Sequence, residues 1–153
     1  MSRRVAEASL QAWLAGEHAA IYGYGVLGAR LPARLRPAAV AALNAHRGRR
    51  DALQALVAGR GLAPVPAAPA YDLPAPVRDA ADALRLAIEL EERLAAVSYG
   101  VVATADTTDV RRVAAVAMQE QAVRAAGWRS LDRIAPPTTP FPGRPGMTGN
   151  SSP

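Results

Sequence analysis

Seven ionisable residues interrupt apolar stripes in the sequence and are the best candidates for chemistry. They are Glu17, His46, Arg50, Glu91, Glu92, Glu120 and Arg124. Carboxylates and imidazoles are ligands that proteins use to hold iron or manganese, whereas carboxylates that face arginines form ion pairs. The same residues could therefore build a metal centre or a salt-bridged interior.

The spacing of apolar residues predicts that these charged groups point inward. Leu14, Glu17 and Ile21 are separated by three and four residues, and residues at this spacing lie on one face of a helix. The same steps place Arg50 inward and its neighbour Arg49 on a solvated face. Each helical segment thus contributes at least one inward polar group.

The intervals between these residues repeat along the chain. From Glu17 to His46 the interval is 29 residues, and from Glu91 to Glu120 it is again 29. We interpret the repeat as two similar helical hairpins, in which residues equally far from the turn lie at one level. The pattern therefore predicts a single polar layer in the middle of the molecule.

Proline and glycine divide the chain into the four helices that must position this layer. The helices are predicted over residues 3–31, 37–61 (with a stop at Gly59 or Gly61), 76–101 and 107–131. Pro32 disfavours a helical conformation in the residue before it, and Pro37 suits the first turn of a helix. Asp79 is expected in an early turn of the third helix, where the helix dipole stabilises an acidic side chain. Thr107, Thr108 and Asp109 form a capping sequence for the fourth helix.

The connections between the helices predict the fold. Residues 61–76 hold five prolines, which indicates a long extended crossover, whereas the other two connections are short. We therefore expect an all-α protein: an antiparallel four-helix bundle made of two helical hairpins joined by the crossover. The bundle is expected over residues 1–134, followed by a Pro/Gly-rich tail over residues 135–153.

Composition excludes several classes of protein. Aromatic residues make up 5% of the chain and there is no cysteine, so an all-β fold, disulfides and thiolate catalysis are not expected. The net charge is +5, but the arginines alternate with helix formers and few aromatics accompany them, so we expect no nucleic-acid partner. No apolar run is long enough for a signal peptide or a membrane span, so the expected location is the cytoplasm.

Two common motifs, for dinucleotide binding and for a serine nucleophile, give no support for a cofactor site or for nucleophilic catalysis. Residues 23–28 match the Gly-x-Gly-x-x-Gly fingerprint, yet they lie inside a helical pattern and follow no strand, so a dinucleotide site is not expected. There is no Gly-x-Ser-x-Gly sequence for a serine nucleophile.

Several stretches resemble the ferritin-like domain of an uncharacterised actinobacterial family. They are Glu17–Gly25, Ala45–Asp51, Ala70–Pro74 and Phe141–Gly143. The resemblance spans about residues 8–143 and implies a ferritin-like bundle, commonly assembled as a dimer. Metal-bearing ferritin-like proteins carry a Glu on helices one and three and Glu-x-x-His on helices two and four. This sequence departs from that pattern, because Leu43 and Val123 stand where the Glu of helix two and the His of helix four would be.

Charge counting favours a metal-free interior. Glu17, Glu91 and Glu120 face Arg50 and Arg124, which leaves too little negative charge to balance two iron ions. A metal, if bound, would be iron or manganese held by Glu17, His46, Glu92 and Glu120.

Two functional hypotheses follow. The first is a metal-free interaction or scaffolding protein without cofactor, acting as a homodimer formed through the surplus apolar surface of the first helix. The second is a metal-dependent oxidase or small-molecule-binding enzyme that uses the interior Glu/His layer, with an unknown ligand. The sequence leaves open whether the protein is an enzyme.

Overall fold

The structure, a computed structural model, describes residues 2–134, 137–138 and 141–144. Its four α-helices are α1 (Arg3–Gly28), α2 (Arg36–Gly59), α3 (Ala80–Thr104) and α4 (Thr108–Leu131), and a short 3-10 helix, η1 (Ala33–Leu35), precedes α2. The described residues contain no strand. The prediction of an all-helical protein with four helices is thus confirmed. None of these helices is long and apolar enough to cross a membrane.

The helix ends follow local chemistry, but α1 ends at Gly28, three residues before the predicted end, and α3 ends at Thr104, three residues after it. Thr107 caps α4 by accepting a hydrogen bond from the backbone N–H of Val110 at 3.3 Å, as expected. The third helix begins later than predicted, at Ala80, because Asp79 is its extended N-cap and accepts from the N–H of Asp82 at 2.8 Å. Asp79 therefore stabilises this helix from outside its first turn.

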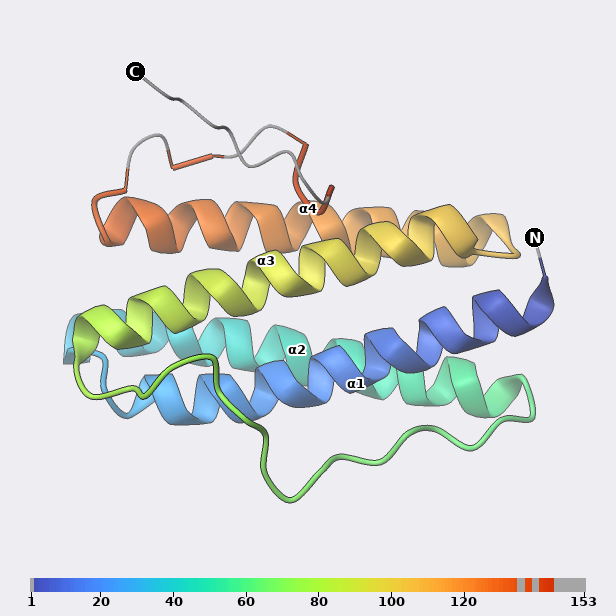
Figure 1. Ribbon diagram of the computed structural model, residues 1–153, viewed down its shortest axis with the longest axis horizontal. Coiled ribbons are helices and arrows are strands. Elements are labelled where there is room, and N and C mark those ends of the chain that lie inside the picture. The colour runs from blue at the N-terminus through green and yellow to red at the C-terminus, as the bar shows by residue number, and fades with distance from the viewer. Residues whose placement is uncertain (1, 135–136, 139–140, 145–153) are drawn as a thin grey trace.

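The four helices form two hairpins that turn at opposite ends of the molecule (Figure 1). Contacts between α1 and α3 run in opposite directions along the chain: Ser9 bonds to Thr104, and Tyr24 bonds to Glu91. Helix α1 packs on α2 and α3, and α3 packs on α4, whereas α2 and α4 approach each other less closely. One side of the bundle is therefore more open than the other three.

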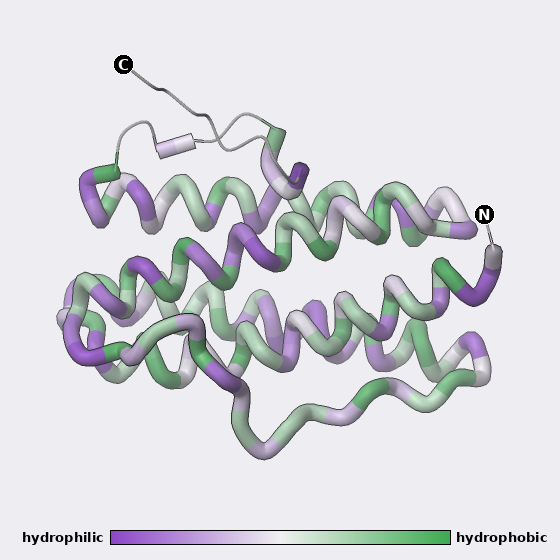
Figure 2. Tube along the Cα trace, in the orientation of Figure 1, coloured by the Kyte–Doolittle hydropathy of each residue, from purple (hydrophilic) through white to green (hydrophobic). Residues whose placement is uncertain are grey.

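The Pro-rich crossover lies along α1 and covers part of it (Figure 1). The Gln11 side chain donates to the carbonyl of Ala63 at 2.7 Å and accepts from the N–H of Val65 at 2.8 Å. The rings of Tyr22 and Tyr71 lie 5.6 Å apart. Apolar positions recur along the crossover as they do along the helices (Figure 2).

This cover changes the basis of the expected dimer. The sequence placed surplus apolar surface on α1, but Leu10 is fully buried and Tyr22 and Val26 are half-buried. The crossover and the neighbouring helices therefore cover part of that surface, while Gly25 and Ala29 stay exposed.

The core consists of two apolar clusters. One is built around Leu10, Trp13 and Val57, and the other around Tyr24, Leu27 and Trp128. On α3 the buried Glu91 falls between the two clusters, whereas on α1 the buried Glu17 lies within the stretch that belongs to the first.

Parts of the expected tail pack on the helices. Gly143 has a φ of 80° and lies so close to α3 that a Cβ would overlap the carbonyl oxygen of Ala95. Arg129 of α4 donates to the carbonyl of Pro137 at 3.2 Å. Residues 135–136, 139–140 and 145–153, also predicted as tail, lie outside the described residues.

Candidate functional site

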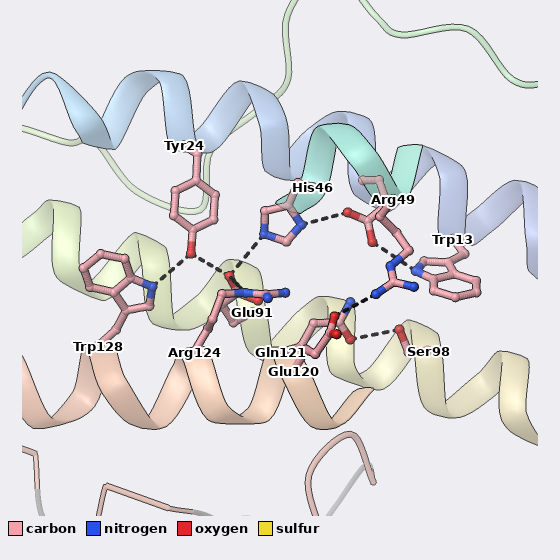
Figure 3. Close-up of polar contacts among 11 residues, drawn as sticks. Trp13, Tyr24, His46, Arg49, Glu91, Ser98, Glu120, Gln121, Arg124 and Trp128 are labelled. Atoms are coloured by element: carbon pink, nitrogen blue, oxygen red, sulfur yellow. Dashed lines mark hydrogen bonds and ion pairs between the residues drawn. The ribbon is translucent and has the colours of Figure 1, made fainter. Parts of the chain in front are cut away.

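A buried histidine between two buried carboxylates forms the centre of the site. Glu17 of α1, His46 of α2 and Glu91 of α3 are 0%, 1% and 0% exposed. The Nδ1 atom of His46 lies 2.8 Å from Oε2 of Glu17, and its Nε2 atom lies 3.1 Å from Oε1 of Glu91 (Figure 3). Three helices thus bring together three of the residues that the sequence singled out.

The geometry favours a positively charged His46. A neutral imidazole has one N–H and one bare nitrogen, and the bare nitrogen would repel a carboxylate oxygen. Burial by itself lowers the pKa of His46, but hydrogen bonds to Glu17 and Glu91 and their negative charges outweigh it and raise the pKa to about 9. Both ring nitrogens therefore donate at neutral pH.

Glu91 is the hub of the network. Besides His46, its Oε1 atom accepts from the hydroxyl of Tyr24 at 2.6 Å and from Nε of Arg124 at 2.9 Å. Burial works to raise the pKa of Glu91, but the hydrogen bond and charge of His46, together with Arg124, hold it below its usual value. Its Oε2 atom is buried and has no partner among the described residues.

Two tryptophans terminate the network. Trp13 donates from Nε1 to Oε1 of Glu17 at 3.1 Å, and Trp128 donates from Nε1 to the Tyr24 hydroxyl at 2.9 Å. Burial, and then the charge of Glu91, raise the pKa of Tyr24, so this phenol stays neutral and donates. A continuous chain of hydrogen bonds therefore joins the two apolar clusters.

The charges of this network cancel. Glu17 and Glu91 contribute two negative charges, while protonated His46 and Arg124 contribute two positive charges. Buried charges persist in proteins when they are paired and hydrogen-bonded. The arrangement meets that condition except at one oxygen of Glu91.

Three residues assigned to the interior by sequence are half-buried or exposed. The side chain of Arg50 is 29% exposed and pairs with Asp51, and that of Glu120 is 48% exposed and pairs with Arg49. Glu92 is 46% exposed and pairs with Arg129. The prediction of an interior position was therefore wrong for Arg50, Glu92 and Glu120.

Helix rotation explains two of these errors. Neighbouring helical residues point about 100° apart, so a modest rotation exchanges which one faces inward. On α4 the inward position belongs to Gln121, which is 1% exposed and whose side-chain amide forms a hydrogen bond with the Ser98 hydroxyl at 2.9 Å. On α2, Arg49 takes the inner side, with its guanidinium 5.8 Å from the Trp13 ring centre.

Sequence reasoning treated the aromatic members of the network as apolar core only. Trp13, Tyr24 and Trp128 are 0%, 2% and 4% exposed, and each uses its polar atom. A signal was available, because a buried indole N–H or phenol usually finds a partner.

The residues proposed as metal ligands do not converge. Glu92 and Glu120 pair with surface arginines, and both ring nitrogens of His46 are engaged with carboxylates. Across residues 2–134, 137–138 and 141–144, no group of three or more His, Cys, Asp or Glu residues is placed to hold a metal ion. The set Glu17, His46, Glu92 and Glu120 therefore does not fit one metal centre.

A pair of arginine variants tests this placement. Arg124→Ala removes a charged donor to Glu91 and is expected to lower the free energy of unfolding by about 1.5–3 kcal/mol. Arg50→Ala removes only an exposed pair with Asp51, so its cost should stay within about 0.5 kcal/mol. Urea unfolding of both variants at neutral pH gives the comparison. Equal losses would contradict the exposed position of Arg50.

Comparison with known proteins gives a family and a close structural relative. A crystal structure of a conserved hypothetical protein from Mycobacterium tuberculosis has 39% sequence identity and a TM-score of 0.84, and the match covers 86% of this chain and 99% of that one. No curated protein matches significantly. Residues 9–146 match the family described as Domain of unknown function (DUF4439). Since the match includes Phe141–Arg144 beyond the fourth helix and covers most of the chain, the protein belongs to the DUF4439 family.

Proposed function

We propose that this protein is a metal-free, ferritin-like antiparallel four-helix bundle that serves as an interaction or scaffolding module. The ferritin-like assignment is supported by the long crossover between the second and third helices and by the opposite directions of the α1 and α3 contacts. The polar layer has a structural role in this proposal: it fixes how α1, α2, α3 and α4 fit together.

The placement of His46 is the observation that carries the proposal. In a ferritin-like metal site, a histidine nitrogen and several carboxylates point at the cation. Here the imidazole occupies that position as a cation itself, between Glu17 and Glu91, and Arg124 supplies a second positive charge. A metal ion would have to displace a proton and overcome the repulsion of Arg124.

An apolar stripe on α4 supports the interaction role. Val113, Val116, Val123 and Leu131 are 42%, 45%, 72% and 45% exposed. Exposed apolar groups that gather on one helix are typical of protein contacts. We propose an isologous homodimer through this stripe, in place of the first helix.

The experiment is a measurement of metal content and mass on protein purified without chelator. We expect iron and manganese far below one ion per chain, no rise in melting temperature with ferrous iron, and a dimer by light scattering. Val123→Asp places a charge on the α4 stripe and should yield monomers. Its matched control is Val5→Asp, at a 43% exposed valine outside α4, which should leave the dimer intact. Near-stoichiometric iron or manganese would refute the metal-free interior, and a parent monomer would refute the dimer.

The alternative of a metal-dependent oxidase or ligand-binding enzyme has one observation in its favour. The Oε2 atom of Glu91 is buried without a partner among the described residues, and such an oxygen can accept from a ligand or bind a cation. The metal content of protein purified without chelator decides between the scaffolding role and this alternative. Metal that the parent retains and Glu91→Gln loses would support the alternative.

A further inference from the structure

The tail that follows α4 returns to the bundle and forms a defined turn. Arg144 donates its backbone N–H to the carbonyl of Phe141 at 3.1 Å. Pro142 takes the second position of this turn, and Gly143, with a φ of 80°, takes the third, which is the pattern of a type II turn. Phe141 has a φ of 51°, a value that is uncommon for residues other than glycine. Residues 141–144 therefore adopt one specific backbone shape.

Helix α3 provides a surface that fits this turn. Glu92, Ala95 and Tyr99 follow one another at steps of three and four residues, so they lie on one face of the helix. Gly143 lies against the middle of that face, because a Cβ on Gly143 would overlap the carbonyl oxygen of Ala95 and lie 3.1 Å from the Cβ atom of Tyr99. The carbonyl belongs to the interior of a helix and cannot move aside. The surface therefore selects glycine at the third position of the turn.

A buried arginine makes a second contact with the tail. Arg129 of α4 is 7% exposed and pairs with Glu92 of α3. Its Nη1 atom donates to the carbonyl of Pro137 at 3.2 Å, six residues before Gly143. A charged donor therefore holds the backbone of the tail at the other end of the same surface. The described parts of the tail lie beside α3 and α4 (Figure 1).

The side chains of the turn face away from this surface. Phe141 is 62% exposed, and the guanidinium of Arg144 lies 6.0 Å from the centre of its ring. The contacts with α3 and α4 are made by Gly143 and by a backbone carbonyl instead. The surface thus recognises the shape of a Pro-Gly turn, and its contacts do not use the covalent connection to α4.

We propose that this surface, which we call the tail site, binds a Pro-Gly turn as a peptide ligand, and that the tail of a second copy can take the place of the chain's own tail. The site consists of Glu92, Ala95 and Tyr99 of α3 and Arg129 of α4. The short connection to α4 gives the chain's own tail a high effective concentration, so it occupies the site and excludes the second copy. The proposal rests on the interaction role and names a partner segment for it.

A labelled synthetic peptide of residues 137–144 is the probe for a second copy's tail. Gly143→Ala in the full chain prevents its own turn from fitting Ala95, so the peptide should bind the site it leaves. Fluorescence anisotropy should show one saturable site per chain and an affinity about tenfold or more above that of the parent, whose site is occupied. Gly48→Ala is the matched control, since a Cβ at this exposed glycine meets nothing within 4 Å, and it should bind like the parent. No binding to the Gly143→Ala chain, or equal binding to all three chains, would overturn the proposal.

Two further changes test what the site recognises. A peptide that itself carries Gly143→Ala should bind the Gly143→Ala chain about tenfold more weakly than the unchanged peptide, because alanine is strained at this φ and meets Ala95. Adding Arg129→Gln to the chain should weaken the unchanged peptide about tenfold. Arg93→Gln, at a 63% exposed side chain paired with Glu89, should leave binding within about twofold. Equal binding of the two peptides would overturn recognition of the turn, and equal effects of the two arginine variants would overturn the Arg129 contact.

The tail site and the α4 dimer fail on different readouts. Val123→Asp acts on the α4 stripe, so a chain with Val123→Asp and Gly143→Ala should be a monomer that still binds the peptide. A monomeric parent whose Gly143→Ala variant binds the peptide would refute the α4 dimer and support the tail site. A dimeric parent whose Gly143→Ala variant binds no peptide would refute the tail site and leave the α4 dimer.

Discussion

Replacing His46 with leucine is expected to lower the free energy of unfolding by about 3–5 kcal/mol, the usual cost of breaking a buried ion pair. The substitution removes the cation that separates Glu17 from Glu91, both of which are 0% exposed. Arg124 then remains as the single positive charge for two buried carboxylates. Urea unfolding at about pH 6, where the imidazole is charged in both states, measures the loss.

The matched control is Arg47→Leu, one residue further along α2. Arg47 is exposed, and its side chain contacts only Asn44 at 3.3 Å among the described residues, so the expected change is within about 0.5 kcal/mol. Adding Glu17→Gln to the His46→Leu protein should recover part of the loss, because it removes one uncompensated charge. A His46→Leu protein as stable as Arg47→Leu would show that the network does not stabilise the fold.

Stability should decline when the pH rises above neutrality. The pKa of His46 is raised from 6.5 to about 9 by its carboxylate partners against the opposing effect of burial, so the folded protein binds this proton more tightly than the unfolded chain. The resulting stabilisation is fully present below pH 6.5 and is lost as the pH rises through about 9. A shift of this size corresponds to about 3 kcal/mol.

The contribution of Glu91 to stability is lost when the pH falls, whereas that of His46 is lost when the pH rises. Because its pKa lies below 4.5 in the folded protein, its contribution is present above pH 4.5 and is lost as the pH falls through the lowered value. Taken together, these two groups predict a plateau of stability between about pH 4.5 and 6.5.

Urea unfolding at about pH 6 and pH 9.5 measures the alkaline decline, and His46→Leu is the control. That variant lacks the titrating imidazole, so its stability should change little over the same range. A parent that is equally stable at both pH values would contradict the charged state of His46.

The sequence alone determined the helices and most of the buried network. Proline and glycine positions predicted four helices and the long crossover, because these residues restrict the backbone locally. Charges inside apolar stripes identified Glu17, His46, Glu91 and Arg124, because helical periodicity depends only on spacing along the chain. All four belong to the network, and His46 and Arg124 both contact Glu91.

Tertiary structure decided which member of each adjacent pair faces the interior. Arg49 rather than Arg50, and Gln121 rather than Glu120, lies on the inner side. Neighbouring residues differ by about 100° around a helix, and their facing depends on how the helix rotates against its partners. The spacing within one helix contains no information about that rotation.

Two further features depended on contacts between distant segments. The Tyr24 hydroxyl joins Glu91 and Trp128, residues 67 and 104 positions away in the chain. The crossover covers part of α1, through Gln11 and Tyr22. The sequence determined that these side chains need partners, because buried polar atoms and apolar surface both require them, but only the packing of the whole chain selected the partners.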